Sequence, residues 1–412
     1  MRDADGGHDY HELLDLHHAL RLRRTIGRVQ AAGKGRSAAE LLATWPQRLT
    51  DQRHLRESLV LLEPLGDTLA HLYGKLFRDR PHLRALFPDS LDAQRDRLAW
   101  SFRQVADGLD QPDRLVALFD EIGQAHRKLG VRTVHYEPFG EAFIEALRIR
   151  AGAAWRPEWE HAWSRAYDFV AGVMNCAAEH TSTPPYVKAT VVGHERRGPD
   201  LAVLQVHPAQ PYPYLAGQYA TVESPYLPHT WRSYSIANRP SEDGLLEFHV
   251  RATGGNRLSD VLVHKVAPGD VLRLAPARGS LTLAPPSGRG QLLIAGGTGL
   301  APIRALLQEI AHRPDPPATW LFVGARTKGQ LYDLELLRGY AERYPWLRLV
   351  VTVSDEDAYP YEPGTVVDAV SRRGGWAGHD VYVSGPWEMV VAVRQRMMEL
   401  GVEPDRIRYD RH

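Results

Sequence analysis

The 412-residue sequence has a single cysteine, Cys176. One thiol can form neither an intramolecular disulfide nor a cysteine-based metal cluster, so both are excluded. Lys and Arg number 50, as do Asp and Glu, which gives no electrostatic reason to expect nucleic acid or an anionic membrane as the main partner. No apolar run reaches the ~18 residues of a membrane span, and the first thirty residues lack the apolar core of a secretory signal. We therefore expect a cytoplasmic protein without a membrane span.

The chain is long enough for two or three domains of about 150 residues each. A hydrophobic fraction of 43% and a charged fraction of 24% are ordinary for globular domains that bury a core. Residues 1–50 are expected to form an N-terminal extension, in which a basic amphipathic segment precedes a Gly/Lys/Ser-rich stretch. This extension could bind an unknown partner or could be a solvated appendage.

The residues after this extension have a helical pattern as far as about residue 180. Leucines recur at spacings of three and four residues, while Pro64 and Gly66 indicate a break between two helices. Strand-like alternation is nearly absent, so residues 51–180 are predicted to form an all-α domain. The sequence HTSTPPY then has the composition of a linker.

The pattern changes again after the linker. Short β-type segments separated by Gly, Pro, Asn and Asp predict an antiparallel β-barrel over residues 186–287. From 288 to 412 strands alternate with helices, which predicts an α/β domain with a parallel sheet and ligands at the carboxyl ends of its strands. The expected fold class is therefore multidomain: all-α, then β-barrel, then α/β.

The clearest local motif is LLIAGGTGLAPIRALL at 292–307, in which an apolar strand ends in glycines and a helix follows. Glycines let the backbone approach a phosphate, and a helix N-terminus offers free N–H groups and the positive end of a dipole. By itself this motif could also be a tight turn. A second motif, WRSYSIAN, places an arginine and a tyrosine on a predicted strand, where they could contact a pyrophosphate and a planar ring. The downstream HVRATGGNRLSD is a further candidate for a phosphate-binding turn.

In this order the motifs resemble the ferredoxin–NADP reductase family over about 186–410. The resemblance implies an FAD-binding barrel followed by an NAD(P)H-binding lobe. The implied FAD residues are Tyr219, Arg232, Ser233, Tyr234, Ser235, Arg251, Gly254, Gly255 and Ser259. The implied nicotinamide dinucleotide residues are Gly296, Gly297, Thr298, Gly299, Pro302, Ser384, Gly385 and Pro386. Two features depart from the family: Ser384 stands where cysteine is frequent, and the sequence IRYDRH, with Asp410 its only acid, replaces an acidic-aromatic ending.

The helical region resembles the globin domain of flavohemoglobins, and the order globin then flavin reductase is the flavohemoglobin order. The resemblance thus covers about 52–410. It implies that His126, which lies on the apolar stripe of its helix, is the iron ligand of haem b, and that Phe87 packs against the haem. Tyr73, Gln94 and Leu98 would line the distal side, where a phenol can donate a hydrogen bond to bound O2.

On the proximal side the resemblance implies a role for Tyr136, ten residues after His126. Its usual glutamate partner falls at Ala178 by direct counting, with Glu179 one residue further. Either the helix register shifts by one residue and Glu179 serves, or that contact is missing. The residue before the histidine, frequently lysine in the family, is here Ala125.

The activity that this resemblance implies is NAD(P)H-dependent nitric oxide dioxygenation, with electrons passing from NADH or NADPH through FAD to haem, and with O2 and NO as small-molecule partners. Two alternatives remain open: a haem/flavin oxidoreductase acting on another substrate, or a globin sensor with a vestigial reductase. The choice between NADH and NADPH also stays open, because Arg326 could pair with a 2′-phosphate, lie along the adenine or face solvent.

Overall fold

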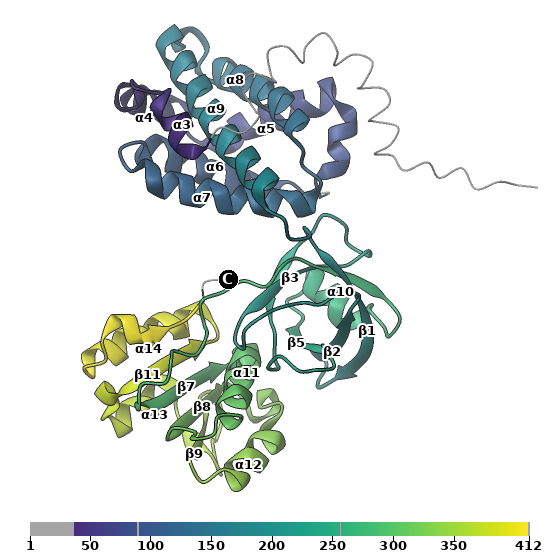
Figure 1. Cartoon of the computed structure of the whole chain (residues 1–412), viewed down its shortest axis with the longest axis vertical. Coiled ribbons are helices and arrows are strands. Elements are labelled where there is room, and N and C mark those ends of the chain that lie inside the picture. The colour runs from purple at the N-terminus through teal and green to yellow at the C-terminus, as the bar shows by residue number, and fades with distance from the viewer. Residues whose placement is uncertain (1–36, 89, 256, 411–412) are drawn as a thin grey trace, which may run out of the picture. The chain divides into compact units, whose positions relative to one another are not determined.

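A computed structural model describes residues 37–88, 90–255 and 257–410 of the chain. These residues form two compact units, which meet in sequence at Pro185 and Tyr186 (Figure 1). Among the described helices none has the length and apolar character needed to cross a membrane. Residues 1–36, which carry most of the expected N-terminal extension and its proposed partner-binding role, lie outside the described residues.

The first unit is entirely helical. Its α-helices are α3 (Ala38–Ala43), α4 (Arg48–Leu62), α5 (Leu65–Asp79), α6 (Asp92–Gly108), α7 (Pro112–His126), α8 (Tyr136–Ala151) and α9 (Pro157–His180). The expected break between two helices is confirmed, since α4 ends at Leu62 and α5 begins at Leu65. One apolar core joins these helices, and Leu69, Leu72 and Trp163 are buried in it.

The packed helical core begins before residue 51. Trp45 is only 3% exposed and belongs to the core. Its indole Nε1 donates to Asp51 Oδ2 at 2.6 Å, and Arg165 of α9 donates to both oxygens of the same carboxylate at 2.7 and 2.8 Å. Residues 38–50 therefore pack with the helical core, although the sequence grouped them with the N-terminal extension.

The second unit begins with a six-stranded antiparallel sheet in the order β4-β3-β6-β1-β2-β5. A bridge between Ile236 and Phe248 joins the end of β4 to β5, so the sheet nearly closes on itself. Its elements are β1 (Val187–Arg196), β2 (Leu201–Pro208), β3 (Tyr219–Glu223), β4 (Arg232–Ser235), β5 (Leu246–Arg251), α10 (Leu258–His264) and β6 (Val271–Leu274). Alternate residues fill the interior, as the period of two in strands requires.

A parallel sheet in the order β10-β9-β8-β7-β11-β12 forms the rest of this unit. Its strands are β7 (Gly290–Gly296), β8 (Thr319–Ala325), β9 (Leu347–Val353), β10 (Glu362–Pro363), β11 (His379–Ser384) and β12 (Ile407–Arg408). Its helices are α11 (Leu300–Ala311), α12 (Leu334–Arg343), α13 (Val366–Arg373) and α14 (Trp387–Glu399). Leu293 of β7 packs in the core with α11 and α12, whereas Leu292 packs in the core with α13 and α14, so helices cover both faces (Figure 1). The predicted fold class is confirmed in all three parts.

Candidate functional site

Three aromatic rings gather where α5 meets the corner that follows it. The ring of Tyr73 lies 5.8 Å from that of Phe77 and 5.5 Å from that of Phe87, and Phe77 and Phe87 are 5.3 Å apart, centroid to centroid. Arg84 fixes the corner, because its Nη1 donates to the carbonyl oxygens of Phe87 and Pro88 at 3.0 and 2.9 Å. The structure thus brings Tyr73 and Phe87 together, although fourteen positions separate them in the sequence.

Tyr73 and Gln94 are the polar residues predicted on this side. Burial raises the pKa of Tyr73 to about 12, so its hydroxyl keeps its proton at neutral pH. Gln94 of α6 has a buried side-chain oxygen with no hydrogen-bond partner among the described residues. Leu98, one turn further along α6, packs against the same apolar core. A buried amide oxygen without a partner is costly unless a ligand or water supplies a donor, which fits a ligand-binding pocket.

His126 is the last residue of α7, and its imidazole is oriented by its own helix. Nδ1 lies 2.8 Å from the carbonyl oxygen of Ile122. Since a carbonyl only accepts, Nδ1 must carry the proton, and Nε2 is left with a free lone pair. Burial lowers the pKa of His126, which favours the neutral form that binds metals. These residues fit a haem: His126 would ligate the iron, with its Nδ1–H hydrogen-bonded as in most metal-ligating histidines.

One positive charge lies within electrostatic reach of both candidate sides of the haem. The charge of Arg97 of α6 contributes a lowering of the pKa of Tyr73, against the larger rise that burial causes. The same charge also contributes to the lowered pKa of His126. In each case its effect is smaller than that of burial. The two residues therefore share one neighbourhood, although they lie on different helices.

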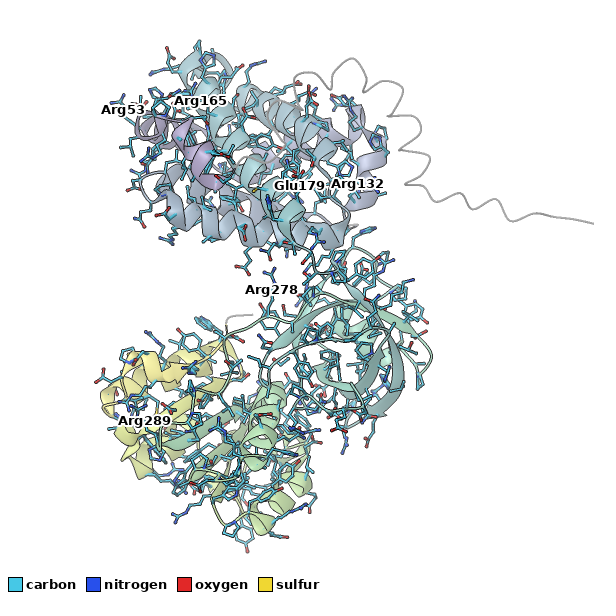
Figure 2. The ribbon with its side chains drawn as sticks, viewed as in Figure 1. Arg53, Arg132, Arg165, Glu179, Arg278 and Arg289 are labelled. Carbon is cyan, nitrogen blue, oxygen red and sulfur yellow. The ribbon has the colours of Figure 1, made fainter. Side chains whose placement is uncertain are left out.

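The proximal side is less complete than the resemblance implies. Tyr136 is the first residue of α8, where burial raises its pKa to about 12 and its carbonyl accepts a hydrogen bond from the Tyr167 hydroxyl at 2.5 Å. Glu179, labelled in Figure 2, is exposed near the end of α9, whereas Ala177 is 4% exposed. In this structure, Glu179 is not brought to the imidazole of His126, whose Nδ1 is engaged by Ile122 instead.

In the second unit the Arg-x-Tyr-Ser motif forms β4. Its partner strand is β3, with Tyr219 opposite Ser235 and Ala220 opposite Tyr234. Burial raises the pKa of Tyr234, whereas Arg232 is exposed and donates to the Trp231 carbonyl oxygen at 2.8 Å. Ser233 lies between them on the same strand. The two predicted flavin-contacting strands are therefore neighbours.

In the candidate phosphate-binding turn after β5, several backbone amides donate to side chains of the protein itself. Gly254 and Gly255 have φ of +76° and +81°, a conformation that favours glycine. Apart from its chain neighbours, no atom of the described residues lies within 4 Å of the position that a Cβ on Gly254 would take, which leaves room for a ligand beside the backbone. The Ser259 hydroxyl accepts from the Thr253 amide at 3.3 Å, and the Asp260 carboxylate accepts from the amides of Gly254 and Arg257, each at 2.8 Å.

Arg251, predicted to face the pyrophosphate, is paired within the protein. Its Nη1 lies 2.6 Å from Asp200 Oδ2. Sequence reasoning missed both Asp200 and Asp260. The position of Asp260 three residues after Asn-Arg was a usable signal, because an acid there caps the first turn of a helix; Asp200 gave no such signal.

The Gly-Gly-Thr-Gly motif joins β7 to α11, as predicted. Gly297 has φ of +55°, and nothing lies within 4 Å of the position that its Cβ would take. A Cβ on Gly299 would overlap the carbonyl oxygen of Ser384 at the end of β11, so this turn and the Ser384-Gly385-Pro386 segment are in contact. Thr298 and Pro302 lie in the turn and the first turn of the helix. Free amides at a helix N-terminus with bare glycine beside them suit a dinucleotide phosphate.

Two further residues stand at the edges of these sites. Arg326 follows β8 with its side chain exposed, so the structure leaves its three interpretations open.

Asp410 reaches back to the barrel: its Oδ1 accepts from the amide and the hydroxyl of Ser280 at 2.7 and 2.8 Å. A Cβ on the adjacent Gly279 would meet both Asp410 and Tyr219, and Asp410 Oδ2 is buried with no hydrogen-bond partner among the residues that the structure describes. The altered C-terminal segment therefore still places an acid beside a predicted flavin residue.

Comparison with known proteins assigns each part of the chain. Family models match for Globin at residues 70–174, for the Oxidoreductase FAD-binding domain at 188–282 and for the Oxidoreductase NAD-binding domain at 293–395. The chain is therefore an oxidoreductase that combines a haem-binding globin with FAD- and NAD-binding domains, and its cofactors are haem, FAD and NAD(P)H.

Two known proteins match this chain over nearly their whole length. The flavohemoprotein of Bordetella pertussis is 27% identical over 377 residues, which cover 84% of this chain and 94% of that protein. The crystal structure of a flavohemoglobin from Malassezia yamatoensis superimposes with a TM-score of 0.70 at 18% identity, covering 87% of this chain and 98% of that one. A ferredoxin–NAD(P)(+) reductase component from Ralstonia is 31% identical over 226 residues, 54% of this chain and 68% of its own length. Over most of its length the chain is therefore similar to flavohemoproteins, with a globin followed by FAD- and NAD-binding oxidoreductase domains.

Proposed function

We propose that this protein is a flavohemoglobin that acts as an NAD(P)H-dependent nitric oxide dioxygenase, which consumes O2 and NO and forms nitrate. The observation that supports the proposal is a pair of groups in the helical unit, both within reach of the charge of Arg97: a neutral His126 whose Nε2 keeps its lone pair, and a protonated Tyr73. The reductase domains on the same chain supply the other half, a source of electrons.

The residues of this chain would divide the work as follows. When bound, the cofactors supply the redox chemistry, with a two-electron donor in NAD(P)H, a flavin that can release electrons singly and a haem iron that binds diatomic gases. His126 would hold the iron, and Phe87 would pack against the porphyrin. The hydroxyl of Tyr73 is a hydrogen-bond donor for a diatomic ligand that acquires negative charge. Leu98 would keep water out of the same space.

In the second unit, β3 and β4 would hold the flavin through Tyr219, Tyr234 and Ser235. The Gly254-Gly255 turn would lie beside the FAD pyrophosphate, with Ser259 close by. The turn from Gly296 to Pro302 would hold the nicotinamide dinucleotide, with Ser384 at the nicotinamide. Asp200 leaves Arg251 little freedom to contact a phosphate, so we assign the pyrophosphate to the exposed Arg232 together with the Gly254-Gly255 turn.

The test is NO consumption by the purified holoprotein in air-saturated buffer, followed with an NO electrode and with nitrate analysis. We expect rapid loss of NO that depends on NADH or NADPH, with one nitrate formed for each NO consumed. Comparison of the two nucleotides decides the donor. Haem that is reduced without NO loss would favour a different substrate, and haem that NAD(P)H never reduces would favour a sensor with a vestigial reductase.

A further inference from the structure

Arg304 lies on α11 only two residues after Pro302, in the helix whose N-terminus carries the candidate nicotinamide turn. It is 9% exposed, which is unusual for an arginine. A buried guanidinium requires partners, and the structure supplies them from both parts of the second unit.

Two carboxylates hold this guanidinium. Arg304 Nη2 lies 2.6 Å from Glu247 Oε1 of β5 in the barrel, and Nη1 lies 2.9 Å from Asp333 Oδ2, directly before α12 in the α/β lobe. The Asp333 side chain is only 2% exposed, and its backbone has φ of +58°, a conformation that few residues other than glycine adopt. One planar fork thus joins a barrel strand to two elements of the lobe.

A histidine and a tyrosine extend the network. His249 lies two residues after Glu247 on the same face of β5, with Nε2 3.0 Å from Glu247 Oε1 and 3.1 Å from Arg304 Nη1. Its Nδ1 lies 3.0 Å from the Tyr332 hydroxyl of the lobe. Burial opposes ionisation of Glu247, but the hydrogen bond with His249 and the charge of Arg304 outweigh it and hold the pKa of Glu247 at about 2.

The packing beside this network is incomplete. A cavity of about 550 Å³ borders it, lined on the barrel side by residues of β1, β2 and β5 and on the lobe side by Arg304, by residues between 328 and 336 and by Tyr361. Elsewhere Leu201 and Ala216 of the barrel pack in the apolar core that contains α11, whereas beside this cavity the polar network joins the two parts. Buried ion pairs add little net stability, but their directional geometry can specify one arrangement.

We propose that Arg304 is a positioning residue for hydride transfer: by joining α11 to β5 and Asp333, it fixes the nicotinamide-binding turn relative to the flavin-binding strands. In the step it positions, one hydride passes from NAD(P)H to FAD and leaves NAD(P)+ and the anionic reduced flavin. The inference rests on the reductase half of the proposed function and not on the chemistry of NO. Displacements of about 1 Å can cost a hundredfold in such a step.

The test substitutes Arg304→Lys, which keeps the charge but cannot span two carboxylates with a rigid fork. The matched control is Arg273→Lys, whose Nη1 lies 3.0 Å from the buried carboxylate of Glu223 with both partners in the barrel. Flavin reduction by NADH is followed anaerobically by stopped flow in the holoprotein. We expect Arg304→Lys to lower the limiting rate constant by between about tenfold and a hundredfold. In Arg273→Lys the limiting rate constant should change by no more than about twofold. In Arg304→Lys the FAD content and the NADH concentration that gives half the limiting rate should also change by no more than about twofold.

A second readout does not depend on turnover. The charge-transfer absorbance of reduced flavin with NAD+ reports on the stacking of the two rings, and we expect it to weaken in Arg304→Lys and not in Arg273→Lys. Glu247→Gln, which removes the barrel carboxylate at nearly constant volume, should repeat both effects and be non-additive with Arg304→Lys.

An unchanged limiting rate constant in Arg304→Lys and in Glu247→Gln would overturn the proposal. So would a loss confined to FAD content or thermal stability, since that would make the network only structural. Because O2 and NO are absent from these measurements, a protein that fails to consume NO would still give a clear result here.

Discussion

The imidazole Nδ1 of His126 lies 2.8 Å from the carbonyl oxygen of Ile122, one helical turn earlier. This contact selects the tautomer in which Nε2 keeps its lone pair. The iron-binding form of the residue is thus set by the helix on which it lies.

The first prediction concerns His126 itself. His126→Gly should yield protein without haem that retains FAD, because the two candidate sites lie in different units. Added imidazole should restore haem absorbance, since it can occupy the vacated position with its own lone pair. The measurement is the ratio of Soret to flavin absorbance in purified protein. The exposed His161 provides the control, and a Soret band of normal height in His126→Gly would refute the assignment.

The second prediction concerns Tyr73. Tyr73→Phe should raise the rate constant of O2 release from the reduced protein by between about tenfold and a hundredfold, the value of a lost hydrogen bond to a charged acceptor. Because the pKa of Tyr73 is raised to about 12, its hydroxyl stays protonated at lower pH. The wild-type rate constant should therefore be flat between about pH 6 and pH 10. Flash photolysis measures it, with Tyr340→Phe as control, and an unaltered rate in Tyr73→Phe would assign the donor elsewhere.

The third prediction concerns Arg165 and Asp51. The pKa of Asp51 is lowered because hydrogen bonds from Arg165 and Trp45 and the charge of Arg165 outweigh the opposing effect of burial. A depressed carboxyl pKa stabilises the folded state above the unfolded pKa, 3.8, and that stability is lost as pH falls through the folded pKa. Arg165→Met should cost about 1–2 kcal/mol at neutral pH, a value reduced because Arg165 is partly exposed.

The stability difference between wild type and this variant should begin to shrink as pH falls below 3.8, and it should vanish below the folded pKa of Asp51, where the carboxyl group is protonated in the folded state as well. Urea unfolding followed by far-UV circular dichroism measures both effects. Arg53→Met is the control, because Arg53 lies 3.8 Å from Glu57 in an exposed pair and is labelled with Arg165 in Figure 2. Equal losses in the two variants would mean that burial of Asp51 contributes nothing.

The fourth prediction concerns the nicotinamide turn. In Gly299→Ala the new methyl group would overlap the carbonyl oxygen of Ser384, so the turn must move away from β11. The NADH concentration needed for half-maximal flavin reduction should rise at least about tenfold, with FAD content unchanged. Gly339→Ala in α12 is the matched control, since nothing lies within 4 Å of the added carbon. Normal NADH dependence in Gly299→Ala would exclude the turn from the binding site.

The structural features that could be predicted from the sequence are those determined by residues close together in the sequence. Pro64 ends one helix because of its own ring, and Gly297 takes a positive φ because it has no side chain, so both could be identified from local residue types. The order of the three parts followed from the periods of their apolar residues in the same way.

Partners that are distant in sequence could not be found by such reasoning. Asp410 hydrogen-bonds Ser280 across 130 positions, and Arg304 reaches Asp333 across 29. Arg251 has the residue type of a phosphate ligand, but Asp200 pairs with it 51 positions away. A motif therefore shows which groups a side chain can bind, whereas the fold determines which group it contacts.

The last prediction concerns Glu179, for which the sequence left two registers open. Its exposed carboxylate is solvated and screened, and Nδ1 of His126 is already bonded to Ile122. Glu179→Gln should therefore leave the haem midpoint potential and the rate of haem reduction unchanged. Ala178→Glu, which moves a carboxylate to the half-buried neighbouring position, should lower the potential by favouring the oxidised iron. Spectroelectrochemical titration measures both variants. A raised potential in Glu179→Gln alone would mean that this glutamate does reach the proximal histidine when haem is bound.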